Sequence, residues 1–525
     1  MSGAGADGRS KSNVPKYLAV IAIVLFVTAA LAGIYSFGLA GSGGRTTSSS
    51  GGATTTTTAT DYTTSSSATC ATPPLLEGAK VDSTTFGGIT EYAFPVNRTP
   101  GGVAVAPDGS VWVGEWGLPG VAHITANGTV TEYRWPYPDG TGGGNCGQVT
   151  NIWGVALWNG SVWGSDFFYS RLVGVDPATG QTQLIDLKNG TTPYTLAVTD
   201  GDLWFTASKL GAQIGKVSPT NGSVTYYNLP TGKSWETTYI LFPSANATVG
   251  YVLDLNADDY FQAQVFSFDP MLNSPTFTAV GQNQTLYAPT GLTLGEGGLW
   301  ATEHSASAMA FLNFTTGAWT IYPTSTVPYT PWVLTYFDGS NGTAVWFNEH
   351  YGNRMGVIYD NSTQLTEYNV SNPPLYNLTT ITDPTNGTNM VTMASTQDGA
   401  WFAAAGGFVG YVNGSYVPPF SIAAGATSIQ VAPGGSSKVS LTLTGVTAQN
   451  NLSLQFSDNE NNSATPQLLS FTTPPLAPSS GGGGPDQVTL TIGAAASVKP
   501  GTYVAAATVT DGSIYRSVYF TVVVT

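Results

Sequence analysis

Four acidic residues end copies of one short pattern, in which a carboxylate follows a tryptophan at the third position after it. They are Glu115, Asp166, Glu303 and Glu349. Carboxylate oxygens that converge can hold a hard divalent cation, so these four are the candidate metal ligands, and Mg²⁺ or Ca²⁺ is the cofactor that they could bind. The same side chains can instead accept backbone hydrogen bonds and orient loops, and this structural role is our first expectation.

Two of these acids stand directly before a histidine, as Glu303-His304 and Glu349-His350. Two imidazoles and two carboxylates from consecutive repeats could form a transition-metal site or supply a general base, which makes them the candidate catalytic residues. Neighbouring residues on a strand point to opposite sides, so one pair acts together only if the strand ends between its members. Duplication of a repeat is the alternative explanation.

Aromatic residues recur close to the same positions of the repeats: Trp116, Trp153, Tyr194 and Trp332. Such side chains can stack on an apolar ring or on a sugar, so they are the candidate ligand-binding residues. The alternative is that they fill the hydrophobic cores of the repeats.

The elements that would position all these residues are strands. The stretch GGVAVAPDGSVWVGEWG, from Gly101 to Gly117, predicts two antiparallel strands joined at Pro107-Asp108-Gly109. Variants of it recur at intervals of about 45 residues, separated by strands of the form x-T-E-Y, which is typical of a β-propeller. Residues 84–417 contain seven such units. The strand at Ile89 precedes the first unit and is predicted to pair with the last, which would close the ring.

These motifs resemble those of the virginiamycin B lyase (streptogramin lyase) family of seven-bladed β-propellers. The shared features are T-E-Y-x-x-P, P-D-G-x-[LV]-W-[FV]-x-E and a strand like Ile214-Gly215-Lys216-Val217. The resemblance implies an all-β propeller over residues 84–417. It also implies a carbon–oxygen lyase that opens a cyclic depsipeptide with a metal held by glutamates and a histidine base.

The family's histidine stands directly before the inner strand of a blade. The matching positions here hold Gly101, Trp153, Tyr194, Thr290, Trp332 and Asn389. None of them is histidine, and the whole chain has 3 histidines. Because proton abstraction needs a base within hydrogen-bonding reach, a diverged lyase or hydrolase is the alternative function, and binding or scaffolding is the first.

The N-terminal part predicts a membrane anchor. Residues 18–40 carry no charge and are long enough, at about 1.5 Å per residue, to cross a bilayer core of about 30 Å. Arg9, Lys11 and Lys16 precede them, so residues 1–17 should be cytoplasmic and the rest outside the cell. A cleaved signal peptide is the competing interpretation. Residues 41–83, rich in Ser, Thr and Gly, are predicted to form an extracellular tether.

Two further features fit an extracellular protein. The only 2 cysteines, Cys70 and Cys146, could form one disulfide or remain two thiols. Asn-x-Ser/Thr sequons recur between Asn97 and Asn461, and N-linked glycans would then coat the turns. Asn-Gly is also a common hairpin turn, so turn chemistry alone would produce some of these sequons.

Residues 418–525 follow a plain two-residue alternation and predict an immunoglobulin-like β-sandwich of the kind appended to prokaryotic surface proteins. The net charge of −15 leaves little scope for a phosphate-binding basic patch, which argues against nucleic acid. The sequence thus predicts an archaeal or bacterial surface protein that binds an extracellular small molecule, glycan or protein and is anchored in the membrane by a single N-terminal helix.

Overall fold

The computed structural model describes residues 74–94, 98–136, 150–208, 211–232, 234–256, 262–281, 286, 288–325, 331–339, 342–349, 352–359, 364–371, 390–396, 398–404, 407–447, 449–458, 469–472 and 486–525. The predicted helix at 18–40, Cys70, Cys146 and His350 lie outside these residues. Within them, no helix has the length and hydrophobicity needed to span a bilayer. Strands dominate, and the only helical element there is the short 3-10 turn η1 (His304–Ala306).

The strands form eight sheets, which we number S1 to S8. The next sentences give their strands in spatial order. S1 contains β1 (Glu77–Lys80), β7 (Thr129–Arg134), β6 (Gly120–Ile124), β5 (Val111–Glu115) and β4 (Pro100–Val105). S2 contains β11 (Thr182–Asp186), β10 (Arg171–Val175), β9 (Ser161–Asp166) and β8 (Ile152–Trp158). S3 contains β12 (Thr192–Thr199), β13 (Asp202–Ser208), β14 (Gln213–Val217) and β15 (Val224–Asn228).

The next two sheets keep this antiparallel order of four strands. S4 contains β16 (Trp235–Leu241), β17 (Gly250–Asn256), β18 (Ala263–Phe268) and β19 (Thr278–Val280). S5 contains β20 (Leu292–Gly295), β21 (Gly298–Glu303), β22 (Ala308–Asn313) and β23 (Trp319–Pro323).

The last sheets combine distant parts of the chain. S6 contains β24 (Pro331–Gly339), β25 (Gly342–Glu349), β26 (Arg354–Tyr359), β27 (Gln364–Asn369), β38 (Ile514–Val524), β37 (Gly501–Thr510), β34 (Asn451–Asp458) and, beside β38, β32 (Ser428–Val431). S7 contains β2 (Asp82–Phe86), β3 (Ile89–Ala93), β30 (Phe408–Asn413), β29 (Gly399–Ala404) and β28 (Met390–Thr396). S8 contains β31 (Ser421–Ala424), β33 (Ser436–Thr444), β36 (Asp486–Ala494) and β35 (Leu469–Thr472).

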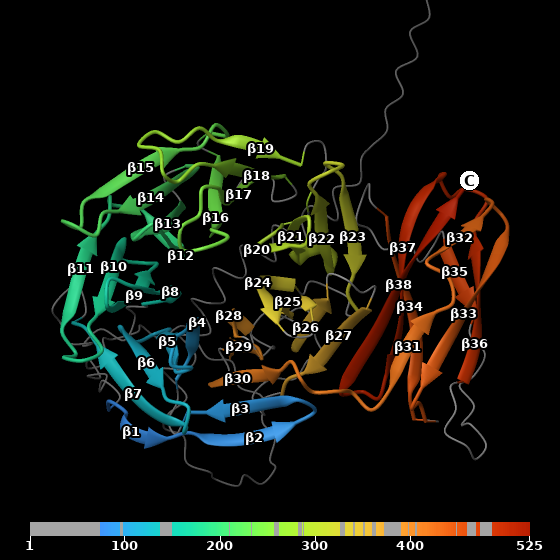
Figure 1. Ribbon diagram of the computed structural model, residues 1–525, viewed down its shortest axis with the longest axis horizontal. Helices are drawn as coiled ribbons and strands as arrows, with labels where there is room; N and C mark the ends of the chain where they lie inside the picture. Colours follow the sequence, from blue (N-terminus) through green and yellow to red (C-terminus); the bar gives the residue numbers. More distant parts are fainter. Residues whose placement is uncertain are drawn as a thin grey trace, which may run out of the picture.

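Sheets S1 to S7 surround a common centre, as in a β-propeller (Figure 1). Their innermost strands contact one another in the closed cycle β4, β8, β12, β16, β20, β24, β28 and back to β4. Each sheet buries both of its faces against its neighbours in the ring, which is why the strands carry apolar residues on both sides. The repeated sequence pattern therefore encodes one packing unit.

Glycines in the third strand of several sheets make room for an aromatic ring from the second strand. A Cβ on Gly215 would overlap the ring of Phe205, and a Cβ on Gly356 would overlap the ring of Phe347. Both phenylalanines are fully buried. This close approach explains the glycine of the Ile214-Gly215-Lys216-Val217 motif, because any side chain there would displace the core aromatic.

The N-terminal strands close the ring. Strand β3 pairs with β30, with Ile89 opposite Val412, as the sequence predicts. Strand β2 extends S7 by one more strand, and β1 adds to the outer edge of S1 by pairing with β7. The described strands therefore begin at Glu77, inside the segment 41–83 that the sequence assigns to a tether. The reason is that β1 pairs with β7 of S1 and β2 pairs with β3 of S7, which satisfies backbone groups of both strands.

The C-terminal strands are joined to the ring through one shared strand. The first half of β38 pairs with β27, with Gln364 opposite Val518, and its second half pairs with β32. A buried apolar cluster crosses the same boundary and includes Trp300, Phe347 and Tyr519. The Tyr519 hydroxyl also donates a hydrogen bond to the Pro323 carbonyl at 2.9 Å. Several C-terminal strands thus continue S6, and β37 and β34 pack against β23 of S5 (Figure 1).

Candidate functional site

The candidate metal ligands occupy one structural position, at the end of the second strand of a sheet. Glu115 stands opposite Pro100, Asp166 opposite Ile152 and Glu349 opposite Pro331, in each case next to a bulge in the first strand. Glu303 is the last residue of β21. All are buried. The repeated W-x-x-[ED] spacing therefore places each acid at the same end of its sheet.

A fifth acid, Asp254, belongs to this set. It stands opposite Thr237, again beside a bulge, and is fully buried. Tyr251 replaces the tryptophan in this repeat, so the pattern based on tryptophan does not find it. The Thr231 hydroxyl donates a hydrogen bond to Asp254. Burial, together with the charge of Glu236, raises the pKa of Asp254 to about 7.

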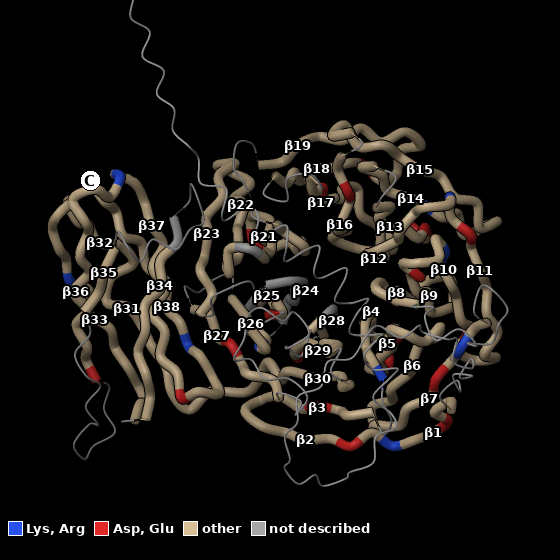
Figure 2. The backbone as a smooth tube through the Cα atoms, turned by 180° about the vertical axis from the view of Figure 1, so that it is seen from behind, with Lys and Arg blue, Asp and Glu red and all other residues tan. Residues whose placement is uncertain are grey.

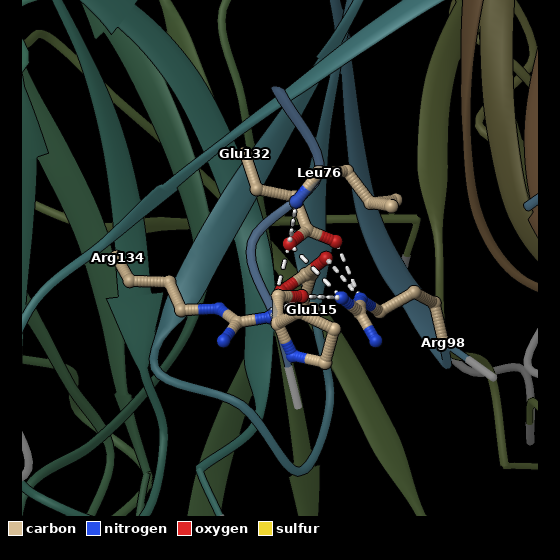
Figure 3. Close-up of polar contacts among 6 residues, drawn as sticks. Leu76, Arg98, Glu115, Glu132 and Arg134 are labelled. Carbon is tan, nitrogen blue, oxygen red and sulfur yellow. Dashed lines mark hydrogen bonds and ion pairs between the residues drawn. The ribbon is translucent and has the colours of Figure 1, made fainter. Parts of the chain in front are cut away.

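Glu115 lies in a buried cluster with Glu132 and Arg98 (Figure 3). The Arg98 Nε atom is 3.6 Å from Glu115 Oε1 and also contacts Glu132 Oε1. Burial and the negative charge of Glu132 raise the pKa of Glu115 to about 8, against the opposing effect of Arg98. Burial would also raise the pKa of Glu132, but hydrogen bonds from Arg98 and the Leu76 N–H outweigh it and lower that pKa. The cluster thus favours the protonated form of Glu115 and the ionised form of Glu132.

Asp166 is paired with an arginine in the neighbouring strand. Arg171 Nη2 lies 2.8 Å from Asp166 Oδ2, and Arg171 Nε donates to the same oxygen at 2.8 Å. Burial raises the pKa of Asp166 to about 6, although Arg171 opposes the shift. A guanidinium group in this place pairs with Oδ2 of the carboxylate and repels a cation. Glu115 and Asp166 therefore fit the structural role better than a metal site.

Glu303 and His304 meet the condition for acting together. Strand β21 ends at Glu303 and the 3-10 turn begins at His304, so the two side chains need not point to opposite sides. Both are buried. S5 and S6 are neighbours, since β21 contacts β24, which places Glu349 in the adjacent sheet. Among the described residues, however, no three His, Cys, Asp or Glu side chains are grouped closely enough to hold a metal ion.

At Gly101, one of the six positions compared with the family's histidine, neighbouring atoms occupy the space that a side chain would need. The indole ring of Trp116 lies over this glycine, so a Cβ there would overlap the ring and approach the Ile152 carbonyl oxygen to 2.7 Å. The Thr392 hydroxyl donates to the Gly101 carbonyl at 2.5 Å. A larger side chain at residue 101 would thus require Trp116 to move.

Three of the four candidate ligand-binding aromatics come together. The ring centroids of Trp116 and Trp153 lie 4.4 Å apart, and those of Trp153 and Tyr194 lie 4.7 Å apart. Phe167 joins them, with its centroid 6.3 Å from that of Trp153. Trp332 lies on β24, and its side chain is outside the described part of the chain.

A cavity of about 110 Å³ opens beside this aromatic cluster. Its lining comes from the innermost strands around the ring centre and consists of Val103, Trp153, Gly154, Val155, Tyr194, Thr195, Leu196, Tyr239, Thr392 and Met393. None of these residues is charged. The hydroxyls of Thr195 and Thr392 donate to backbone carbonyls, and each hydroxyl oxygen keeps lone pairs that can accept a hydrogen bond. Burial raises the pKa of Tyr239 to about 12, which keeps its hydroxyl neutral.

The glutamates of the T-E-Y strands are important residues that sequence reasoning missed. Glu367 accepts a hydrogen bond from the Ser325 N–H at 3.0 Å, and Glu91 accepts one from the Ser371 N–H at 2.6 Å. In both cases the donor lies in the link that leads into the glutamate's own sheet. In S1, the corresponding link lies between β3 and β4, and its Arg98 contacts Glu132. The recurrence of T-E-Y in the sequence could have identified these glutamates as candidates. The acids of this motif hold the links between sheets, and Figure 2 shows acidic positions in red at many points around the ring.

Comparisons with known proteins identify structural neighbours and no sequence family. The sequence matches no protein-family model and no curated protein. Virginiamycin B lyase from Staphylococcus aureus has 20% sequence identity and a TM-score of 0.48, with 62% of this chain and 98% of that chain covered. A streptogramin B lyase has 21% identity and a TM-score of 0.49 over 62% of this chain and 97% of that one. YCF48 bound to a D1 peptide has 11% identity and a TM-score of 0.44 over 65% of this chain and 100% of that one. The described part of the chain consists of strands and one short 3-10 turn, and its structural neighbours include propellers of the virginiamycin B lyase type.

Proposed function

We propose that the chain is a cell-surface binding protein. Residues 18–40 anchor it in the membrane of an archaeal or bacterial cell, and everything after residue 40 lies outside. Residues 84–417 form a seven-bladed propeller, and residues 418–525 form an immunoglobulin-like sandwich. The closed cycle of innermost strands supports the propeller. The sandwich is supported by a second sheet, S8, which shares a buried cluster with β37 and β38.

The ligand is an uncharged molecule that inserts one ring into the cavity beside Trp153 and Tyr194. The observation that carries this proposal is the cavity lining, which combines aromatic rings, aliphatic side chains and hydroxyl oxygens with no charged group. Small apolar cavities of about 150 Å³ bind benzene in other proteins, so this one is of the size of a single ring. The ligand can be a free small molecule, or the ring can belong to a glycan or a protein.

The surrounding electrostatics also favour a neutral ligand. Arg171 compensates Asp166, and Arg98 lies against both Glu115 and Glu132. These acids are therefore already paired with arginines, and a charged ligand would lose its hydration in a cavity whose lining has no charged group to pair with it. Ring stacking and burial of apolar area would supply the binding energy.

A titration with two small probes of similar shape tests this proposal. Phenol is uncharged and carries one hydrogen-bond donor, whereas benzoate carries a negative charge. The protein used is the ectodomain, residues 41–525. Binding is followed through tryptophan fluorescence, because Trp116 and Trp153 lie within the aromatic cluster. We expect saturable quenching by phenol and at least tenfold weaker quenching by benzoate. Equal responses to both probes, or no response to phenol, would contradict the proposal.

A metal-dependent lyase or hydrolase is the second candidate, and one specific observation favours it. Strand β21 ends between Glu303 and His304, and both side chains are buried at the same end of the sheets as Glu349. In such an enzyme His304 would be the base, and Glu303 with Glu349 would bind Mg²⁺ or Ca²⁺, which would polarise the substrate.

The test is incubation of the ectodomain with a streptogramin B depsipeptide and Mg²⁺. The binding proposal predicts no ring opening above the rate without protein. Metal-dependent ring opening that is lost in Glu303→Gln and His304→Ala would instead establish the enzyme. His123→Ala is the matched control, since His123 stacks on Trp112 with centroids 4.3 Å apart, in S1.

A further inference from the structure

Four asparagines of the sequons share one turn geometry. Asn127 and Asn221 lie in the turns that join the third and fourth strands of S1 and S3, and Asn313 and Asn413 end the third strands of S5 and S7, β22 and β30. Each Oδ1 accepts a hydrogen bond from the backbone N–H two residues later. The donors are Thr129 at 3.1 Å, Ser223 at 3.0 Å, Thr315 at 2.9 Å and Ser415 at 2.9 Å. These donors are the Ser or Thr residues of the four sequons.

This geometry leaves the amide nitrogen available. Every hydrogen bond that the described structure gives these four side chains uses Oδ1, including those from Thr125 and Lys80 to Asn127. Asn127, Asn221 and Asn413 are exposed, and Asn313 is half-buried. An N-glycosidic bond forms at Nδ2 and keeps the amide carbonyl. The acceptor that holds the turn would therefore survive the modification.

Asn369 also begins a sequon but differs in this respect. Its Nδ2 donates to the Gly512 carbonyl at 2.5 Å, and its Oδ1 accepts from Arg354 Nε at 3.0 Å. The Nδ2 end thus joins β27 to the turn between β37 and β38, and the Oδ1 end is held by β26 of the same sheet. A glycan on Nδ2 would break the contact with Gly512, so this sequon is blocked in the folded protein.

We propose that Asn127, Asn221, Asn313 and Asn413 carry N-linked oligosaccharides and that Asn369 does not. The inference rests on the extracellular placement proposed above. The donor is a lipid-linked oligosaccharide phosphate or diphosphate. The bond between Nδ2 and the sugar C1 forms as the bond between C1 and the phosphate oxygen breaks. The lipid phosphate leaves, and the amide proton passes to solvent.

These positions also give the glycans a direction. Consecutive strands are antiparallel, so the turn after a third strand lies at the end of the sheet opposite to the turn after a second strand. Glu115 and Asp166 end second strands, and Trp116 and Phe167 follow them. Glycans on the four asparagines would thus cover the face opposite to the aromatic cluster. They would leave the cavity beside that cluster accessible.

Aspartates in equivalent turns supply the control variant. Asp176 Oδ1 accepts from the Ala178 N–H at 2.8 Å, and Asp269 Oδ1 accepts from the Met271 N–H at 2.9 Å. Aspartate therefore supports the same type of turn but has no nitrogen to modify. Asn→Asp at the four positions should remove the glycans and leave the midpoint of thermal unfolding close to that of the enzymatically deglycosylated wild type.

The experiment expresses the ectodomain through a secretory pathway that N-glycosylates proteins. Peptide:N-glycosidase digestion in ¹⁸O water then marks each occupied asparagine, and mass spectrometry locates the marks. We expect marks at the four turn asparagines and none at Asn369. Unmarked turn asparagines, or a marked Asn369, would overturn the site assignment. Protein isolated from the cells that make it naturally is the second arm. Absence of glycans there, with marks on the secreted protein, would overturn the extracellular placement and leave the sites standing.

Discussion

The rings of Trp153 and Tyr194 lie 4.7 Å apart and form one wall of the central cavity. Each residue belongs to the innermost strand of its sheet, Trp153 in S2 and Tyr194 in S3. The packing of adjacent sheets thus gives the cavity an aromatic wall, and the uncharged lining of this cavity is the structural reason for proposing binding.

The first prediction concerns Gly101→His, which would restore a histidine at a matching position. We expect a loss of stability of about 2 kcal/mol, because the new Cβ overlaps the ring of Trp116. We also expect no lyase activity. Thermal unfolding measures the effect. Gly501→His is the control, since the nearest atom to a Cβ there is 3.9 Å away. Equal unfolding temperatures for the two variants would contradict the packing described for Trp116.

The second prediction is a pH dependence of stability. The pKa of Glu115 is raised to about 8 in the folded protein from an ordinary value of 4.5. Between these values the folded state binds the proton and the unfolded state does not, so the free energy of unfolding falls as pH rises. The slope is at most about 1.4 kcal/mol per pH unit. The pKa of Glu132 is lowered, so its contribution is lost as pH falls below 4.5.

Urea unfolding between pH 3 and pH 9 would measure this dependence. We expect greatest stability near pH 5. In Glu115→Gln the decline towards pH 8 should become shallower, because Gln has no proton to lose, while the loss at low pH should remain. Asp166 and Asp254, with pKa values of about 6 and 7, account for the remaining decline. A wild-type profile that rises from pH 5 to pH 8 would contradict the burial of Glu115.

The third prediction separates the structural role of Asp166 from metal binding. Arg171→Ala leaves a buried carboxylate unpaired and should cost about 3 kcal/mol of stability. The double variant Asp166→Asn/Arg171→Ala should recover part of this loss. Added Mg²⁺ or Ca²⁺ should stabilise neither the wild type nor the double variant. A rise in the unfolding temperature of the wild type with Mg²⁺ that the double variant lacks would show that Asp166 binds the ion.

The fourth prediction follows from the shared strand β38. Removal of residues 418–525 takes away β38, so that β27 pairs only with β26. It also exposes the cluster around Trp300 and Phe347. We expect the truncated ectodomain to unfold at a lower temperature and to aggregate, because an open, apolar edge strand pairs with other chains. Tyr519→Phe, which removes only the hydrogen bond to Pro323, is the mild control. A truncated ectodomain as stable as the full one would refute the shared sheet.

Local sequence pattern was enough to predict much of the fold. The alternation around Gly101–Gly117 and the T-E-Y strands predicted strands that the structure contains, and Ile89 pairs with β30 as expected. These features depend on residues close in sequence, or on repeats that fold alike. The pairing of β27 with β38 could not be predicted, because it joins residues about 150 positions apart with no shared motif.

The candidate site was predicted only in part for a similar reason. The acid spacing identified Glu115 and Asp166 but gave no sign of Arg98, which comes from a link outside the repeat pattern. The same spacing did not group Asp254 with these acids, because Tyr251 replaces the tryptophan. The neighbouring positions of Trp153 and Tyr194 depend on how adjacent sheets pack, and spacing within one repeat contains no information about that.

Phenol binding to the wild-type ectodomain and to Tyr194→Ala is the most direct test of the proposed function. Tyr194 is half-buried and lines the cavity, so its removal should weaken phenol binding at least tenfold with little loss of stability. Tyr133→Ala is the matched control, because Tyr133 is also half-buried but lies on the outer strand β7. Val155→Phe, which fills the cavity from another wall, should weaken binding as well. Unchanged phenol affinity in both Tyr194→Ala and Val155→Phe would contradict the proposal that this cavity is the binding site.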